Sequence, residues 1–177
     1  FHKAFKEFQY LGLIKEHPTR IHGAQPENCS PIVNAVKAGS DVIRPVNKPN
    51  TIVKSLAIGN PADGFYSIQT MKQTGGSAEN PSDQETIDGI KLLAETEGIF
   101  SETAGGVVVG AAQRLIENGV IGKNESIVLC ITGHGLKTRE AVENHLGKVR
   151  AIQPSLKEFE ELLEQDHEKE GETSHAR

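Results

Sequence analysis

Apolar residues in the second half of the chain recur every three or four positions, the spacing of one face of a helix. Over 81–98 this pattern begins with Ser82 and Glu85, three residues apart as in a capping box, and ends at Gly98. The stretch 104–119, which is rich in alanine and glycine, shows the same pattern. We therefore expect two helices in this part of the chain.

A different apolar pattern stands between these helices and the C-terminus. Residues 126–131 form an almost uninterrupted apolar run, followed by the glycine-flanked turn 132–135. Such a run predicts a strand that is buried on both faces, as in parallel sheets. A shorter run at 99–100 separates the two helices. The order helix, short strand, helix, strand predicts an α/β fold, a three-layer, partly parallel sheet with helices on both faces.

The first half of the chain carries weaker signals. Helical spacing of apolar residues or clear helix punctuation occurs in three stretches, which are 1–17, 30–39 and 65–74. Residues 20–26 read as the end of a strand that leads into a loop. This half is consistent with the same α/β arrangement.

The domain organisation is predicted from a change in the pattern of apolar and polar residues after residue 150. Residues 1–150 are expected to form one domain, and 151–177 a C-terminal helix with a tail. The helix has a second capping box, Ser155 with Glu158. From Asp166 onward the only apolar residue is an alanine, so the tail is expected to be disordered.

Composition narrows the function classes. The 177 residues carry a net charge of −5 with lysine and arginine scattered among acids, so no nucleic-acid partner is expected. No apolar stretch is long enough to span a membrane. Cys29 and Cys130 lack CxxC spacing and are interpreted as buried free thiols in a reducing compartment. The histidines do not show a zinc-ligand spacing, and no metal site is predicted.

Three strand ends could carry chemistry, because a sheet brings such ends to one edge. Thr132 would place a hydroxyl beside Gly133, Glu102 would sit at a helix start, and Gly23 and Ala24 would let a flat ligand lie against the backbone. Each has a structural alternative: a plain turn, an N-cap, or small residues for packing. Gly105 and Gly106 would likewise allow close approach of either a helix or a ligand.

No catalytic residue is assigned. Lys137 is nearest the glycine turn, but its surroundings suggest a solvated loop, and a nucleophilic lysine must be desolvated. His134 could act as an acid or base. Its flanking glycines favour a poorly held, exposed side chain instead.

Several motifs resemble threonine synthase in their order and spacing. They are HGAQPENCSPIVNAVKAG, AIGNPADG, AETEGIFSETAGGVVVGAAQRLIENGVI and SIVLCITGHGLKT. The resemblance covers roughly residues 1–140. It implies a tryptophan synthase β-like fold, the cofactor pyridoxal 5'-phosphate (PLP) and the conversion of O-phosphohomoserine and water to threonine and phosphate.

Carried over position by position, the resemblance implies a cofactor-binding role for four residues. Thr132 matches the hydroxyl that bonds the pyridine nitrogen, and Gly133 matches the turn beside the ring. Glu102 matches an acidic residue near the ring edge, and Ala24, with Gly23, matches small residues on one ring face. The chain departs from the family where Asn often stands at His134 and Asp at Thr138, and where Pro-Ala-Ser often follows Glu102.

The resemblance also implies what lies elsewhere. The family's Schiff-base lysine and its glycine-rich phosphate loop have no counterpart in 1–177, and the chain opens on Phe1. We therefore expect the C-terminal portion of a threonine synthase, with 1–150 belonging to the PLP-binding catalytic domain and an N-terminal half as its partner.

Other interpretations remain open at this point. The expected whole enzyme is a cytoplasmic lyase, and a homodimer is compatible with it. Another PLP lyase of the same fold, such as threonine dehydratase or cysteine synthase, is one alternative. A noncatalytic α/β interaction module is another, favoured by the missing lysine.

Overall fold

The computed structural model describes residues 1–16, 18–146 and 151–164. It divides into two units, Phe1–His145 and Leu146–Arg177. In the first unit the helices and strands are α1 (His2–Tyr10), β1 (Gly23–Ala24), α2 (Pro31–Lys37), α3 (Gly64–Thr74), β2 (Ala78–Glu79), α4 (Asp83–Glu97) and α5 (Thr103–Glu117). Short 3-10 turns lie at Glu27–Cys29, Lys54–Leu56, Gly135–Ala141 and Glu143–His145.

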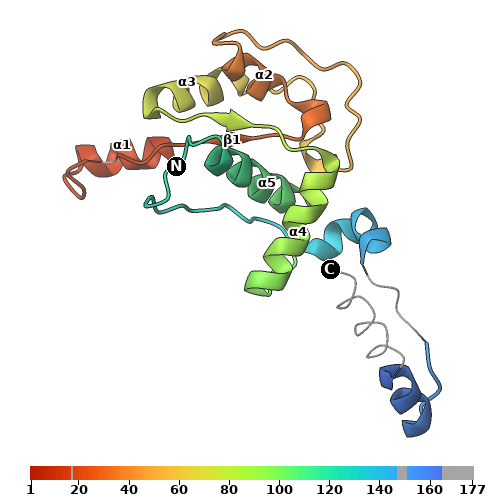
Figure 1. Ribbon diagram of the computed structural model, residues 1–177. Coiled ribbons are helices and arrows are strands. Elements are labelled where there is room, and N and C mark those ends of the chain that lie inside the picture. Colours follow the sequence, from red (N-terminus) through yellow and green to blue (C-terminus); the bar gives the residue numbers. More distant parts are fainter. Residues whose placement is uncertain (17, 147–150, 165–177) are drawn as a thin grey trace. The chain divides into compact units, whose positions relative to one another are not determined.

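The first unit has helices on both faces of a small parallel sheet (Figure 1). β1 pairs with β2, with Gly23 opposite Ala78 and Ala24 opposite Glu79. Helices α2 and α3 lie on one side of the sheet, and α4 and α5 lie on the other (Figure 1). The three-layer, partly parallel arrangement expected from the sequence is confirmed.

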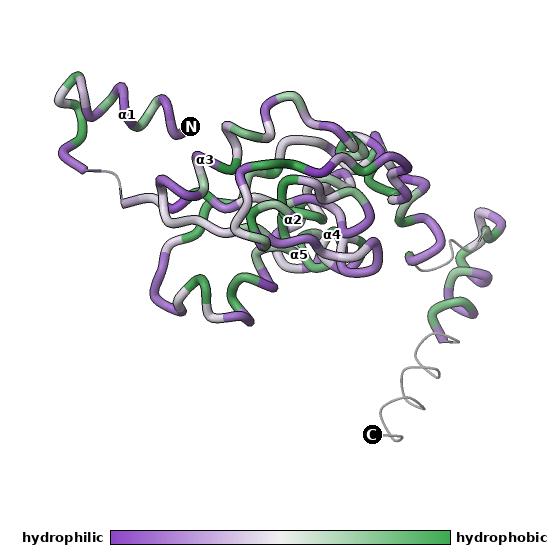
Figure 2. The backbone as a smooth tube through the Cα atoms, turned by 90° about the horizontal axis from the view of Figure 1, so that it is seen from above, coloured by the Kyte–Doolittle hydropathy of each residue, from purple (hydrophilic) through white to green (hydrophobic). Residues whose placement is uncertain are grey.

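Two apolar clusters fill the layers. Val33 of α2, Met71 of α3 and Ala78 of β2 form one cluster between the sheet and its first helix layer. The other joins Ile87 and Ile90 of α4 to Val142, which follows the glycine turn, and Ile52 and Phe100 pack against it. Figure 2, a view from above, shows α2, α4 and α5 gathered at the centre of the unit and α1 at its periphery. None of the residues of α1 is buried.

The strongest sequence patterns gave the correct helices. The capping box at α4 is present: Ser82 Oγ accepts from the Glu85 amide at 3.2 Å, and the Glu85 carboxylate accepts from the Ser82 amide at 2.7 Å. Helix α4 ends at Gly98 with φ of 67°. The helix predicted over 1–17 is shorter than expected, because it ends at Tyr10 and Gly12 follows with φ of 72°.

The predicted buried strand at 126–131 is wrong. No strand is assigned there, residues 126–130 are exposed, and Val128 is 87% exposed. Cys130 is also exposed, against expectation, whereas Cys29 is buried as predicted. An apolar run predicts a preference for burial, but a strand also needs a hydrogen-bonding neighbour, and none pairs with this run in the described part of the chain.

The second unit contains a helix over 156–164. Ser155 Oγ accepts from the Glu158 amide at 3.3 Å, which is half of the predicted capping box. The tail that is expected to be disordered, 165–177, lies outside the described residues. None of the helices in the described ranges is long and apolar enough to cross a bilayer.

Candidate functional site

Backbone hydrogen bonds connect the residues at the start of α5 to the glycine turn 132–135. The Glu102 amide donates to the Gly133 carbonyl at 3.0 Å, and the Gly135 amide donates to the Phe100 carbonyl at 2.9 Å. Ser101 and His134 form the antiparallel bridge between these two bonds. Two of the predicted strand ends are therefore adjacent in space.

The side chain of Glu102 reinforces this contact. Glu102 is only 5% exposed, although it stands at the N-cap of α5. Its Oε2 lies 2.7 Å from the Nζ of Lys137. A buried carboxylate needs such a partner, because desolvation of an unpaired charge is costly. The sequence placed Lys137 in a solvated loop, and its side chain is indeed 63% exposed, but its ammonium group is engaged at the site.

Position 133 has room only for glycine, because the carboxylate of Glu102 lies against it. A Cβ at this position would lie 1.9 Å from Glu102 Oε1 and 2.2 Å from Cδ. The sequence left a plain turn and the approach of a ligand open for this glycine. Within the chain, the group that approaches is the side chain of Glu102.

Gly133→Ala is therefore expected to displace the Glu102 carboxylate and to break its ion pair with Lys137. We expect a loss of about 1–2 kcal/mol in the free energy of unfolding, as for other overpacked sites. Urea denaturation measures this loss. Gly122→Ala is the matched control, because the nearest atom to its added Cβ is Oε1 of the partly exposed Glu125 side chain at 3.2 Å, a contact that a small shift of this side chain relieves. Equal stability of both variants would contradict the close contact.

Thr132 precedes this contact and is exposed. Among the described residues, no hydrogen bond engages its hydroxyl. A threonine hydroxyl can both donate and accept, so this side chain is available to a partner outside the described chain. The structure thus brings Thr132, Gly133 and Glu102 into one place.

Ala24, the fourth predicted site residue, lies on β1 opposite Glu79. Neighbouring Gln25 caps the short helix α2: its Oε1 accepts from the amides of Ile32 at 2.9 Å and Val33 at 3.1 Å. Among the described residues, no hydrogen bond or ion pair connects Ala24 to the Glu102–Gly133 contact. The strand β1 is in contact with α5 as an element.

His134 is held more firmly than the sequence suggested. Its Nδ1 accepts from the Leu136 amide at 3.2 Å, and its ring meets that of Phe100 edge-on at 5.9 Å. Phe100 also lies against Gly135, where a Cβ would come within 2.5 Å of the ring. His134 is exposed as expected, but it is not poorly held, because the Leu136 amide and the Phe100 ring support it.

Two hydroxyls near the start of α5, those of Ser101 and Thr103, are buried and have no hydrogen-bond partner among the described residues. The Thr103 amide itself donates to Thr138 Oγ1 at 3.1 Å. The sequence gave no signal for these groups. Spacing across two loops cannot show that 101–103 and 137–138 meet.

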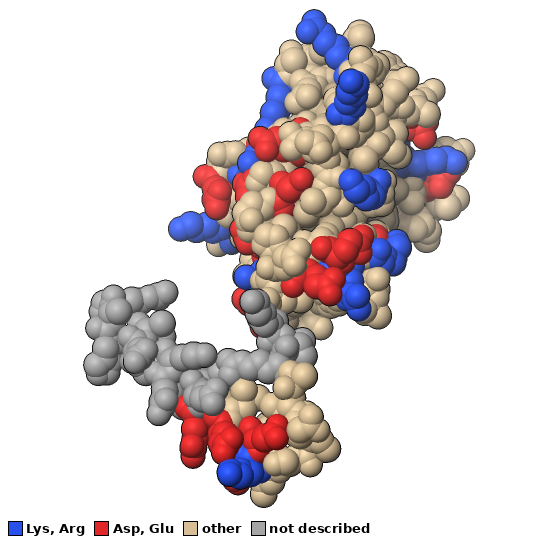
Figure 3. All heavy atoms as spheres, turned by 90° about the vertical axis from the view of Figure 1, so that its right-hand side faces the viewer, with Lys and Arg blue, Asp and Glu red and all other residues tan. Residues whose placement is uncertain are grey.

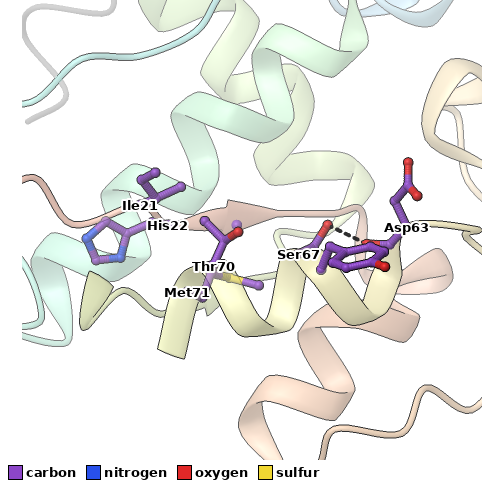
Figure 4. A pocket seen from close by; sticks show the side chains of 8 residues that line it. Ile21, His22, Asp63, Ser67, Thr70 and Met71 are labelled. Carbon is purple, nitrogen blue, oxygen red and sulfur yellow. Dashed lines mark hydrogen bonds between the residues drawn. The ribbon is translucent and has the colours of Figure 1, made fainter. Parts of the chain in front are cut away.

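A separate open pocket of about 540 Å³ lies between the start of β1 and α3 (Figure 4). His22, Tyr66, Ser67 and Thr70 are among its lining residues. Burial, and then nearby Arg20, lower the pKa of His22, whose Nδ1 accepts from the Ser77 amide at 3.0 Å. Gly23 also borders this pocket.

The surface carries charges of both signs. On the face shown in Figure 3, lysine and arginine side chains are interspersed with aspartate and glutamate. Within the described ranges, no group of three or more histidine, cysteine, aspartate or glutamate residues is arranged to hold a metal ion. The absence of a nucleic-acid partner stays a prediction.

Known proteins with similar sequences indicate which family the chain belongs to. The sequence model of the family described as "Pyridoxal-phosphate dependent enzyme" matches residues 2–133. Among curated proteins, the chain is 37% identical over 141 residues to a threonine synthase of Methanosarcina acetivorans, covering 80% of this chain and 35% of the relative. It is 39% identical over 139 residues to that of Methanocaldococcus jannaschii, covering 78% and 34%.

Among solved structures, the fold resembles a fungal L-serine ammonia-lyase from Rhizomucor miehei, with a TM-score of 0.59 and 17% identity. That alignment covers 81% of this chain and 45% of the fungal chain. At this identity the likeness concerns the fold alone, and it agrees with the tryptophan synthase β-like fold expected from the sequence. The chain spans about a third of the length of the curated relatives that it matches. Since the family's sequence model covers most of the first unit, the chain belongs to the pyridoxal-phosphate dependent enzymes.

Proposed function

We propose that the chain is the C-terminal part of a threonine synthase, which converts O-phosphohomoserine and water to threonine and phosphate. The exposed, unengaged hydroxyl of Thr132 beside the Glu102–Gly133 contact carries this proposal. The similarity to threonine synthases over about four-fifths of the chain supports the choice of reaction. The two alternative PLP lyases, threonine dehydratase and cysteine synthase, have no comparable support.

The residues fit one wall of a PLP site. Thr132 offers a neutral hydroxyl of the kind that pairs with a pyridine nitrogen, and Gly133 adds no side chain beside it. The Glu102 carboxylate lies against Gly133 and is paired with Lys137. When bound, PLP supplies the electron sink for carbanion chemistry, and the chain orients its ring. A hydroxyl partner leaves the ring nitrogen less protonated than a carboxylate would.

The proposal assigns the remaining functions to other parts of a longer protein. The Schiff-base lysine, the phosphate loop and most substrate contacts would come from an N-terminal portion, the proposed partner of this chain. We place Ala24 at one face of the ring, residues 1–150 in the PLP-binding domain and the enzyme in the cytoplasm. A homodimer is compatible with this assignment.

A chimera tests the proposed reaction. The N-terminal two-thirds of the Methanosarcina acetivorans threonine synthase would be fused to this chain, and threonine and phosphate formation from O-phosphohomoserine would be measured. We expect turnover, and we expect Thr132→Val to lower kcat/KM at least tenfold, about 1.4 kcal/mol of transition-state stabilisation. Thr96→Val is the matched control, because Thr96 is exposed on α4 and its hydroxyl donates to the Leu92 carbonyl of its own helix at 2.7 Å.

The same chimera separates the alternatives. Keto-acid formation from threonine without turnover of O-phosphohomoserine would indicate a dehydratase. Cysteine formation from O-acetylserine and sulfide would indicate a cysteine synthase. A folded chimera that binds PLP and turns over none of these substrates would favour the noncatalytic module.

A further inference from the structure

We propose that Lys137 is a positioning residue that keeps the proposed cofactor wall in its binding shape by holding the Glu102 carboxylate across Gly133. The inference rests on the proposed function for its purpose, but its geometry stands independently. The sequence offered no role for Lys137, and the resemblance assigned none.

The first observation is the direction of the Glu102 side chain. Glu102 occupies the N-cap of α5, where a carboxylate normally accepts from the first amides of the helix. It makes no such bond. Its Oε1 instead lies over Gly133, and its Oε2 lies 2.7 Å from Lys137 Nζ. The ion pair with Lys137 therefore takes the place of the hydrogen bonds that a carboxylate at an N-cap ordinarily accepts from the helix amides.

The second observation is the replacement of the missing cap. The Thr103 amide, at the first position of α5, donates to the hydroxyl of Thr138 at 3.1 Å. The neighbouring residues 137 and 138 therefore take two complementary roles. Thr138 satisfies the helix start, and Lys137 engages the carboxylate that would otherwise satisfy it.

The third observation is the charge balance. The Glu102 side chain is 7% exposed, and among the described residues Lys137 is the only cation paired with it. Loss of the ammonium group would leave a buried, unpaired carboxylate, which costs more than the pair itself contributes. The carboxylate would then turn toward solvent or toward the amides of α5. Either movement removes the group that packs on Gly133 and loosens the turn that presents Thr132.

Amide hydrogen exchange on the chain itself tests this role, without cofactor or substrate. The reporting amides are those of Glu102, Thr103 and Gly135, which close the contact between the helix start and the turn. The amides of Gly23 and Gln25, bonded to Ser77 and Glu79 across the sheet, are internal references. We expect Lys137→Met to raise exchange at the reporting amides about tenfold relative to the references.

Three further variants distinguish positioning from a general structural effect. Lys137→Arg keeps the charge and should stay within about twofold of wild type. Lys123→Met removes an exposed lysine remote from the site and should change nothing. In a Glu102→Gln background, which removes the charge that Lys137 holds, Lys137→Met should add less than about twofold.

Several results would overturn the inference. They are unchanged exchange in Lys137→Met, an equal rise at reporting and reference amides, failure of arginine to restore protection, or a full Lys137→Met effect in the Glu102→Gln background. None of these results bears on threonine formation by the chimera. A failed positioning role and a failed reaction are therefore distinguishable.

Discussion

Gly106→Val is expected to lower the free energy of unfolding by about 3 kcal/mol or more, the upper range for overpacked cores. A Cβ at Gly106 would lie 2.3 Å from the Thr86 carbonyl oxygen and 2.7 Å from Ile90 Cγ1. Gly89 faces the same place from α4, with its own Cβ position 2.8 Å from the Gly106 carbonyl oxygen. The two helix backbones are therefore in contact, and no rotamer of valine relieves a clash with a carbonyl oxygen.

The effect should be large because α4 and α5 form the most extensive helix contact in the first unit. Valine has a higher helix propensity than glycine, but that gain is only a few tenths of a kcal/mol. Chemical denaturation followed by circular dichroism measures the loss. Gln113→Val places the same side chain at an exposed position of α5 and should stay within about 0.5 kcal/mol of wild type. Similar losses in both variants would contradict the close helix contact.

The role of Gly106 could be predicted from the sequence only in part. A glycine pair at a helix start indicated close approach, but it left a helix and a ligand as equal candidates. The structure assigns the role to packing: α4 lies against Gly106, and the Ser101 side chain lies against Gly105 at 2.7 Å from its Cβ position. Local propensity predicts that something comes near, and only the tertiary arrangement identifies it.

The helices were predictable for a physical reason. Capping boxes and apolar stripes are local, and α4 begins at Ser82 and ends at Gly98 as those signals indicate. The second strand, Ala78–Glu79, had no such signal because it is two residues long. It forms through pairing with Gly23–Ala24, more than fifty positions earlier in the chain.

The candidate site was predictable only in part. Glu102, Thr132 and Gly133 were each noticed at the end of an apolar run, and the first and last of them are in contact. For Lys137 the sequence predicted a solvated loop and therefore no nucleophilic role, and it gave no indication of an ion pair with Glu102. Its side chain is 63% exposed, yet its ammonium group pairs with a buried carboxylate, which composition and spacing do not reveal.

The second large effect is expected at Arg114, which connects α5 to the start of α4. Its Nε and Nη2 donate to the two carboxylate oxygens of Glu85, both at 2.7 Å. Its Nη1 donates to the Asn80 carbonyl at 2.9 Å. Arg114→Met should therefore cost about 2 kcal/mol at pH 7, because it removes a bidentate pair and a further charge-assisted bond.

Urea denaturation measures this cost. Arg139→Met is the matched control. Arg139 pairs with Glu143 at 3.9 Å, but both side chains are largely exposed, so the loss should be under about 0.5 kcal/mol. Equal losses in the two variants would show that the Glu85 pair contributes no more than a surface pair.

The Arg114 pair also predicts the direction of acid destabilisation. Hydrogen bonding from Arg114 is the main cause that lowers the pKa of Glu85 to about 2. In the unfolded chain a glutamate titrates near pH 4.3, so folding favours the ionised form. The stabilisation is therefore complete at neutral pH and is lost as the pH falls from about 5 to about 2. Because 39% of the Glu85 side chain is exposed, solvent screening reduces it to about 1–2 kcal/mol.

The difference in stability between wild type and Arg114→Met isolates this contribution from other carboxylates. Asp41 and Glu125 also have lowered pKa values, through Lys72 and through the Gly122 amide respectively, but both are unchanged in the variant. We expect the difference to shrink between pH 6 and pH 3, because Glu85 becomes protonated in the unfolded chain near pH 4.3, and folding of the wild type must then release that proton. Urea unfolding at several pH values measures it, and a difference that stays constant with pH would show that the Glu85 carboxylate is not what Arg114 stabilises.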